Sequence, residues 1–301
     1  MRLPFHTLDV FTQTRFGGNP LAVVLEADAL PAEAMQQIAR EFALSETVFV
    51  LAPQNPAHTA RLRIFTPNSE LPFAGHPTVG TAALLAQLRN APGQASGEAI
   101  VVLEEGIGPV RAGVRLTHGE PAFAEFDAPK MPVLVPDLGA FEKLSVALGL
   151  LPTEIGFENH KPARFSAGLS YACVPVRDLD TLARVKITAR HWADAFGPMG
   201  AAYVYCRETA HKSAHFRARM FDPGHGISED PATGSAAAAF AGMIAHFDGL
   251  TDGAHKRRIE QGYEMGRPSD ISIEIAIANR AIVSVRIGGH AVRVMDGMLE
   301  I

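Results

Sequence analysis

The sequence predicts an α+β protein made of two domains. Its 301 residues approach the length of two ordinary domains of about 150 residues each. Hydrophobic residues make up 47% of the chain and charged residues 20%, which supplies two apolar cores and excludes an intrinsically disordered protein. A strand, a loop and an alanine-rich helix follow one another twice in the same order, which indicates an internal duplication.

Strand and helix patterns alternate along the first half of the chain. Strands are predicted for the segments rich in β-branched and aromatic residues, which are 5–10, 21–25, 45–51 and 60–65. Glycine and proline at 17–20 predict the turn between the first two strands. Pro31 begins a predicted helix, because apolar residues recur after it at helical spacing. The alanine- and leucine-rich segment 77–88 predicts a second, buried helix.

The domain boundary is predicted in the segment 117–136, where prolines crowd together and helical periodicity is absent. The predicted N-terminal domain spans 1–120 and is completed by a strand near 290–301. The predicted C-terminal domain spans 121–289.

The duplicated unit relates segment 57–67 to segment 214–223. Each segment is followed, after a loop, by the pattern P-x-x-G-[S/T]-A-A, which begins at Pro77 in the first copy and at Pro231 in the second. Proline suits the first turn of a helix, because its φ is fixed and its missing N–H is not needed there. We therefore expect the preceding residues, His76 and Asp230, to lie at the N-caps of two helices.

The two predicted helix starts are candidate ligand sites. The positive end of a helix dipole, with free backbone N–H groups expected at 80–81 and 234–235, binds a carboxylate or a developing oxyanion. We expect the two starts to face a cleft between the domains, a common place for a ligand. Plainer roles stay open, because Asp230 would also serve as an ordinary N-cap and His76 as a structural histidine.

Glu46 is the third candidate. It lies in a predicted strand and shares one face with Val48 and Val50, while the other face is also largely apolar. Poor solvation raises the pKa of a carboxyl group, which suits a general base that removes a proton from carbon. The alternative is a glutamate at the end of a strand whose carboxylate simply reaches water.

Composition disfavours several other classes of protein. The 27 basic and 32 acidic residues give a net charge of −5 without a basic block, so neither nucleic acid nor a membrane surface is an expected partner. No apolar stretch approaches the ~20 residues of a membrane helix, and the N-terminus lacks the apolar core of a signal peptide. Cys173 and Cys206 alone form neither a disulfide framework nor a zinc site, which predicts the cytoplasm. His215 and His225 lack a third ligand, so no metal is expected.

Three motifs give the chain a family resemblance. LSET at 44–47, FAGHPT at 73–78 and EDPATGSA at 229–236 resemble signatures of the PhzF-like family of phenazine biosynthesis isomerases. The resemblance implies the diaminopimelate epimerase fold, in which two pseudo-symmetric domains each curl a mixed sheet around a central helix. It also implies a homodimer that uses no cofactor.

The resemblance assigns roles to individual residues. Glu46 matches the family's general base, and His76 and Asp230 match residues that line its site. The positions that match its substrate-contacting residues are Gly75, Pro77, Thr78, Gly234 and Ser235. Epimerases of the same fold use a pair of cysteines at the two helix starts, where this chain has none, so racemisation by two thiols is not expected.

We therefore expect a cofactor-independent isomerase that moves a proton between carbons of a small carboxylated substrate. Glu46 would remove and return the proton, His76 and Asp230 would relay or orient protons, and the helix starts would hold the carboxylate. Two alternatives stay open at this point. One is a non-catalytic small-molecule binding protein, and the other is an amino-acid racemase with Glu46 and Asp230 as its two bases.

Overall fold

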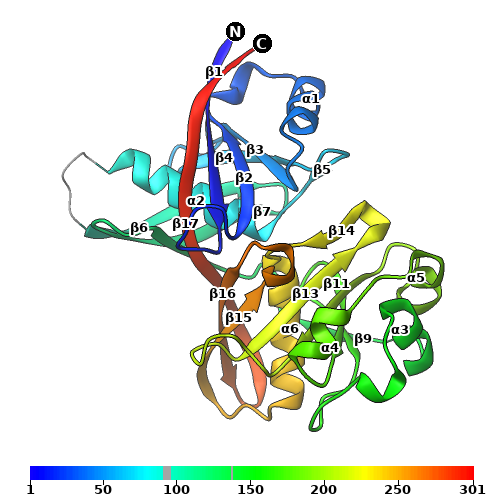
Figure 1. Cartoon of the computed structure of the whole chain (residues 1–301). Coiled ribbons are helices and arrows are strands. Elements are labelled where there is room, and N and C mark those ends of the chain that lie inside the picture. The colour runs from blue at the N-terminus through cyan, green and yellow to red at the C-terminus, as the bar shows by residue number, and fades with distance from the viewer. Residues whose placement is uncertain (91–95, 137) are drawn as a thin grey trace. The chain divides into compact units, whose positions relative to one another are not determined.

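The computed structural model describes residues 1–90, 96–136 and 138–301 and divides into two compact units (Figure 1). Unit 1 consists of Met1–Asp127 and Gly288–Ile301, and unit 2 consists of Ala128–Ile287. No helix within the described residues is long and apolar enough to cross a membrane.

The boundary between the units lies at 127/128, later than the predicted 120/121. The reason is β8 (Ala122–Asp127), which pairs with β7 (Gly108–Thr117) and therefore stays with unit 1. The last segment also belongs to unit 1, because β17 (Ala281–Glu300) pairs along β1 (Arg2–Val10), so that the two chain ends lie side by side (Figure 1).

Unit 1 is a mixed sheet curled around one central helix. Besides β1, β7, β8 and part of β17, its strands are β2 (Asn19–Val24), β3 (Glu46–Leu51), β4 (Ala60–Phe65), β5 (Glu70–Leu71) and β6 (Ser96–Glu105). Its helical elements are η1 (Ala27–Ala29), α1 (Ala32–Phe42) and α2 (Gly75–Arg89). The central helix is α2, which contacts β1, β2, β3, β6, β7 and β8 and is mostly buried. A helix enclosed in this way needs no polar face, which explains its alanine- and leucine-rich sequence.

Unit 2 has the same plan around α6 (Gly234–Phe247), which contacts β9, β10, β11 and β16. Its strands are β9 (Val133–Val135), β10 (Ala163–Ser166), β11 (Ser170–Pro175), β12 (Ala201–Cys206), β13 (Phe216–Asp222), β14 (Ile227–Asp230), β15 (Gly253–Gln261) and β16 (Ser269–Ala278). Its other helical elements are α3 (Phe141–Leu148), η2 (Pro152–Glu154), α4 (Leu179–Arg184), α5 (Ala189–Phe196), η3 (Pro223–His225) and η4 (Tyr263–Met265). A second apolar core joins α3 and α5 to the opposite face of β11 and β12, through residues such as Leu144, Trp192 and Phe196.

Strand pairing confirms the predicted duplication and extends it over most of each unit. The parallel pairs β2–β3 and β4–β6 correspond to β11–β12 and β13–β15. The antiparallel pairs β3–β4, β4–β5 and β6–β7 correspond to β12–β13, β13–β14 and β15–β16. The registers also agree, since Arg61 lies opposite Glu104 in unit 1 and Arg217 lies opposite Glu260 in unit 2.

The predicted helix starts are wrong by a few residues. Helix α2 begins at Gly75 with Ala74 as its N-cap, so His76 and Pro77 lie inside its first turn. Thr233 is the N-cap of α6. Asp230 instead ends β14, where it pairs with Met220 of β13. The N–H groups of 80–81 are likewise not free, because they lie in the second turn of α2, beyond the first-turn N–H groups that a helix leaves unpaired.

The structure also aligns the two copies of the motif differently from the prediction, which paired Pro77 with Pro231. Gly106 and Gly262 each follow the last residue of corresponding strands, and each packs directly against a proline. A Cβ atom on Gly106 would lie 2.8 Å from Pro72 Cα, and one on Gly262 would lie 3.1 Å from Pro231 Cα. Pro72 is therefore the counterpart of Pro231, and His76 is the counterpart of Ser235.

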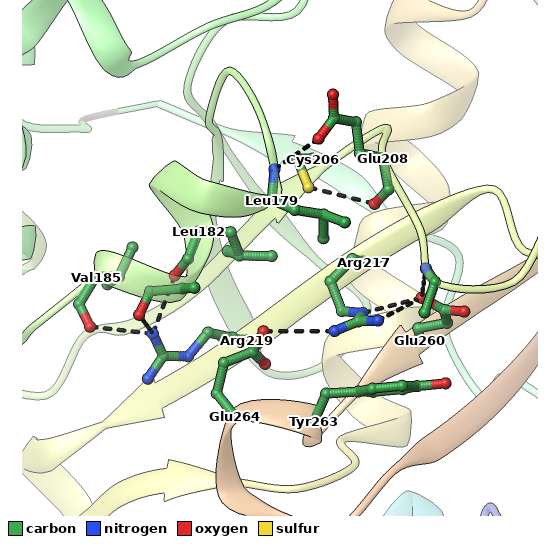
Figure 2. A network of polar contacts seen from close by, with 12 residues as sticks. Leu179, Leu182, Val185, Cys206, Glu208, Arg217, Arg219, Glu260, Tyr263 and Glu264 are labelled. Carbon is green, nitrogen blue, oxygen red and sulfur yellow. Dashed lines mark hydrogen bonds and ion pairs between the residues drawn. The ribbon is translucent and has the colours of Figure 1, made fainter.

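A buried polar network holds β13 and β14 in unit 2, and Figure 2 shows its contacts between Arg219 and the end of α4. Arg219 of β13 donates to the Leu182 and Val185 carbonyls, each at 3.0 Å, at the end of α4. It also forms two hydrogen bonds of 2.8 Å with the Glu229 carboxylate of β14. Because Glu229 directly precedes Asp230, this network holds the strand that presents a candidate site residue.

Candidate active site

Glu46 and His76 meet in unit 1. Glu46 is the first residue of β3, and His76 lies in the first turn of α2. The Nε2 atom of His76 lies 3.3 Å from Oε2 of Glu46, with the side chains 5% and 13% exposed. The Glu46 carboxylate is therefore largely enclosed, whereas the sequence left open that it simply reaches water.

The protonation of His76 follows from its burial. Desolvation lowers the pKa of His76 to about 3, so the imidazole is neutral at neutral pH. The His76 Nε2 atom is close to the Glu46 carboxylate but does not form a hydrogen bond with its Oε2 atom. An imidazole with so low a pKa is a weak base, so the Glu46 carboxylate is the candidate base of this pair.

The start of α2 offers backbone donors beside this pair. Ala74 is extended, with φ −151° and ψ 141°, and no side chain within the described residues caps the helix. The Thr78 N–H returns to the Ala74 carbonyl at 3.2 Å, so the helix is closed from that residue onward. The N–H groups of Gly75 and His76 precede it, at the positive end of the helix dipole, where a carboxylate or an oxyanion is stabilised.

Glu105, which the sequence analysis did not single out, supports this helix start from β6. Its Oε1 atom lies 2.8 Å from the Thr78 hydroxyl, which itself lies 2.8 Å from the Ala74 carbonyl. Because a hydroxyl has only one proton, a protonated Glu105 supplies the second hydrogen bond. Burial raises the pKa of Glu105 to about 8, which is consistent with a neutral carboxyl group.

We expect Glu105→Gln to remove a pH dependence of stability. The pKa of Glu105 is about 8 in the folded protein, whereas its ordinary value is 4.5. The contribution of this group to the free energy of unfolding is therefore fully present below pH 4.5 and is lost as the pH rises through 8. The variant should match the wild type at pH 5 and exceed it at pH 9 in urea unfolding. Glu104→Gln is the matched control, because backbone N–H groups of Asn55 and Gln54 lower the pKa of Glu104, which gives the opposite sign. Parallel curves for wild type and E105Q would contradict the assignment.

Unit 2 presents a second polar group before α6. The buried Asp230 accepts a hydrogen bond of 2.5 Å from the Thr233 hydroxyl. Gln261 of β15 donates to the Asp230 carbonyl at 2.8 Å and to the Thr233 hydroxyl at 3.1 Å. Gln261 occupies the register position that Glu105 has in unit 1, so the same place is filled by a neutral amide in one copy and by a carboxyl group in the other.

Ser235 stands in the first turn of α6, after Gly234, and contacts a residue that the sequence analysis did not assign. Its hydroxyl lies 2.8 Å from the Tyr171 hydroxyl of β11. The preceding residue, Ser170, is the first residue of β11. Tyr171 is buried. In the sequence it looks like an ordinary core residue of a strand, and its hydroxyl is the one feature that could have marked it as a site residue.

The structure thus gathers the predicted residues into two groups, one in each unit. Glu46, His76 and the α2 start, with Gly75, Pro77 and Thr78, form the group of unit 1. Asp230 and the α6 start, with Gly234 and Ser235, form the group of unit 2. Cys173 and Cys206 lie in β11 and β12 and not at a helix start, and burial raises the pKa of both thiols. Among the described residues, no three histidine, cysteine or acidic side chains gather as metal ligands would.

Residues 8–297 match the family model described as phenazine biosynthesis-like protein. The chain belongs to this family. An uncharacterized isomerase of Mesorhizobium japonicum is 52% identical over 298 residues, which cover 97% of each chain. A trans-2,3-dihydro-3-hydroxyanthranilate isomerase of Pseudomonas aeruginosa is 33% identical over 293 residues, which cover 96% of each chain. The family relationship predicted from the motifs is confirmed, and this phenazine biosynthesis-like protein is an isomerase.

Solved structures confirm the predicted fold. A Bacillus anthracis phenazine biosynthesis protein of the PhzF family superposes with a TM-score of 0.88 at 26% identity, covering 100% of both chains. A hydroxyproline epimerase of Agrobacterium vitis, at 15% identity and a TM-score of 0.62 over 99% of this chain and 91% of the other, shares the fold alone. This family member has the diaminopimelate epimerase-like architecture of two duplicated units, each with a mixed sheet around a central helix.

Proposed function

We propose that this isomerase moves a proton between two carbon atoms of a small carboxylated substrate, without a cofactor and with Glu46 as the general base. The observation that carries the proposal is the contact of 3.3 Å between the enclosed Glu46 carboxylate and the neutral His76. The Glu46 carboxylate takes a proton from one carbon, and the electron pair that is left delocalises into the adjacent unsaturated system. The protonated Glu46 then returns the proton to another carbon, which shifts a double bond.

The starts of α2 and α6 supply the stabilisation in this proposal. The N–H groups of Gly75 and Gly234 stand at positive helix ends and suit a carboxylate or the charge that develops when a carbon acid loses its proton. Ser235 and Asp230 offer polar groups that suit contact with a substrate, and their hydrogen-bond partners, Tyr171 and Thr233, hold them in place. Pro77 and Thr78, which were predicted to contact the substrate, lie in the first turn of α2, where the Thr78 N–H bonds to the Ala74 carbonyl.

The substrate class follows from the chemistry of these groups and from a relative. Two helix starts favour a carboxylate, and the Pseudomonas aeruginosa relative is named for an anthranilate derivative, which is a small cyclic carboxylic acid. We therefore propose a small cyclic or amino-acid-like carboxylate, without assigning phenazine synthesis to this chain. A homodimer and a cytoplasmic location stay predictions.

The test is the uptake of deuterium from solvent. Small cyclic and amino-acid carboxylates are incubated with the enzyme in D₂O and followed by NMR, and an isomerase is expected to place label on the carbon that receives the proton. Label at the starting stereocentre, with loss of optical rotation, would show a two-base racemase. Ligands that bind without acquiring label would show a binding protein, so either result would overturn the proposed reaction.

A further inference from the structure

Unit 2 contains a cavity of about 400 Å³ that is not part of the group at the start of α6. It opens beside α5, β9 and β10, and its lining includes Val135, Pro136, Arg164, Ser170, Asp194 and Phe196. Ser170 and Tyr171 are neighbours on β11 and therefore point to opposite faces of the sheet. Tyr171 reaches α6, whereas the cavity lies on the side covered by α3 and α5.

Arg164 brings an incompletely paired positive charge to this cavity. Its Nη2 donates to the Phe196 carbonyl at 2.8 Å, the last carbonyl of α5. Its Nε atom is buried and has no hydrogen-bond partner, and no carboxylate among the described residues forms an ion pair with it. Burial lowers the pKa of Arg164, as expected for a guanidinium that loses water without gaining a counter-charge.

Ser170 adds a second unsatisfied polar group. Its hydroxyl oxygen is buried and, within the described part of the chain, has no hydrogen-bond partner. Arg164 pairs with Ala172 across the β10–β11 ladder, so Ser170, two residues before Ala172, lies on the same face of the sheet. Buried donors that stay unpaired are costly, so two of them at one cavity indicate an absent partner.

The chemistry of the cavity defines the class of that partner. A guanidinium matches a carboxylate in shape and charge, and a hydroxyl adds a third donor. Val135, Pro136 and Phe196 form apolar walls that suit a hydrocarbon body. The exposed carboxylate of Asp194 at the same cavity disfavours a dianion such as phosphate.

We propose that this cavity is a second binding site, in which Arg164 and Ser170 hold the carboxylate of a small organic monoanion. The site does not depend on the reaction assigned to Glu46, because none of the cavity's lining residues belongs to either helix start.

The test uses benzoate as the probe and isothermal titration calorimetry as the measurement. We expect Arg164→Met to weaken benzoate binding at least about tenfold, because methionine keeps the apolar stem but has no charge. Arg190→Met, at an exposed position of α5, is the matched control and should bind as the wild type does. Benzamide, a neutral probe of the same shape, should also bind at least about tenfold more weakly to the wild type, and this comparison does not require any variant to fold.

Location is tested independently by soaking wild-type crystals in 4-bromobenzoate. Anomalous bromine signal between Arg164 and Phe196 supports the proposal. Bromine found only at the α2 or α6 start, or equal benzoate affinity of wild type and R164M, would overturn it. Asp137 stands in the sequence between two lining residues and lies outside the described residues. If benzoate binds to Asp137→Asn but not to the wild type, the chain's own carboxylate is the partner and the proposal falls.

Discussion

Replacing Glu46 by glutamine is expected to lower the rate of solvent deuterium uptake by about 10²–10⁴-fold, because an amide cannot accept a proton from carbon. Glutamine keeps the size of the side chain and can still contact the His76 Nε2 atom, which lies 3.3 Å from the carboxylate in the wild type. The loss should therefore appear in the rate at saturating substrate, with little change in the urea midpoint. Initial rates by NMR, on whichever carboxylate the wild type labels, measure this effect.

The matched control for this substitution is Glu41→Gln, at an exposed position near the end of α1. It removes the same charge from the same unit but lies outside the group formed by Glu46 and His76, so its rate should equal that of the wild type. If E46Q retains its rate within about tenfold while E41Q is unchanged, another residue is the base. Asp230 would then be the first alternative, since it is the buried carboxylate in the group of unit 2.

Local sequence patterns located β1 to β4 and the helices α1 and α2 of unit 1, whereas β5 to β8 were not predicted individually. Strand β4 lies at the predicted residues 60–65, and β3 begins only one residue after the predicted start at 45. These segments carry strong period-two or β-branched signals, because each buries side chains against α2 or α1. The sequence also predicted a duplication, because one strand and one helix repeat in the same order. The structure extends this duplication to the strand order of most of each unit.

The start of α2 could not be placed from proline alone. Pro77 lies in the first turn, as the rule on helix prolines allows, but the helix begins two residues earlier because Ala74 is the residue that leaves helical geometry. Only the strand register, together with the close packing of Gly106 on Pro72, shows which proline corresponds to Pro231. Such information is three-dimensional and has no local sequence signal.

The supporting residues of the site were missed for a related reason. Thr78 and Glu105 are 27 positions apart, and Tyr171 and Ser235 are 64 apart, so no short motif contains either pair. A signal does exist once the duplication is aligned correctly. Glu105 and Gln261 then fall at the same position, directly before a glycine that packs on a proline, which would have marked both as supports of a helix start.

The largest expected effect on stability comes from Arg217→Met in unit 2. The Arg217 and Glu260 side chains are 6% and 3% exposed and form an ion pair of 2.8 Å, with Arg217 also 3.5 Å above the Tyr263 ring (Figure 2). Burial acts to raise the pKa of Glu260, but hydrogen bonds from Ala210, His211 and Arg217 hold it below its usual value. Removing Arg217 leaves a buried carboxylate without its counter-charge, which should lower the free energy of unfolding by about 3–5 kcal/mol.

The duplication supplies the control for this prediction. In unit 1, Arg61 occupies the register position that Arg217 has in unit 2, and it lies opposite Glu104. Within the described residues, however, the Glu104 carboxylate accepts hydrogen bonds from His58 and two backbone N–H groups and not from Arg61. Arg61→Met should therefore cost much less than Arg217→Met in urea unfolding, although both remove an arginine from the same place in the fold. In addition, Glu260→Gln in the R217M background should recover part of the loss, because it removes the uncompensated charge. Equal effects of R61M and R217M would mean that the position in the fold, and not the buried ion pair, determines the stability.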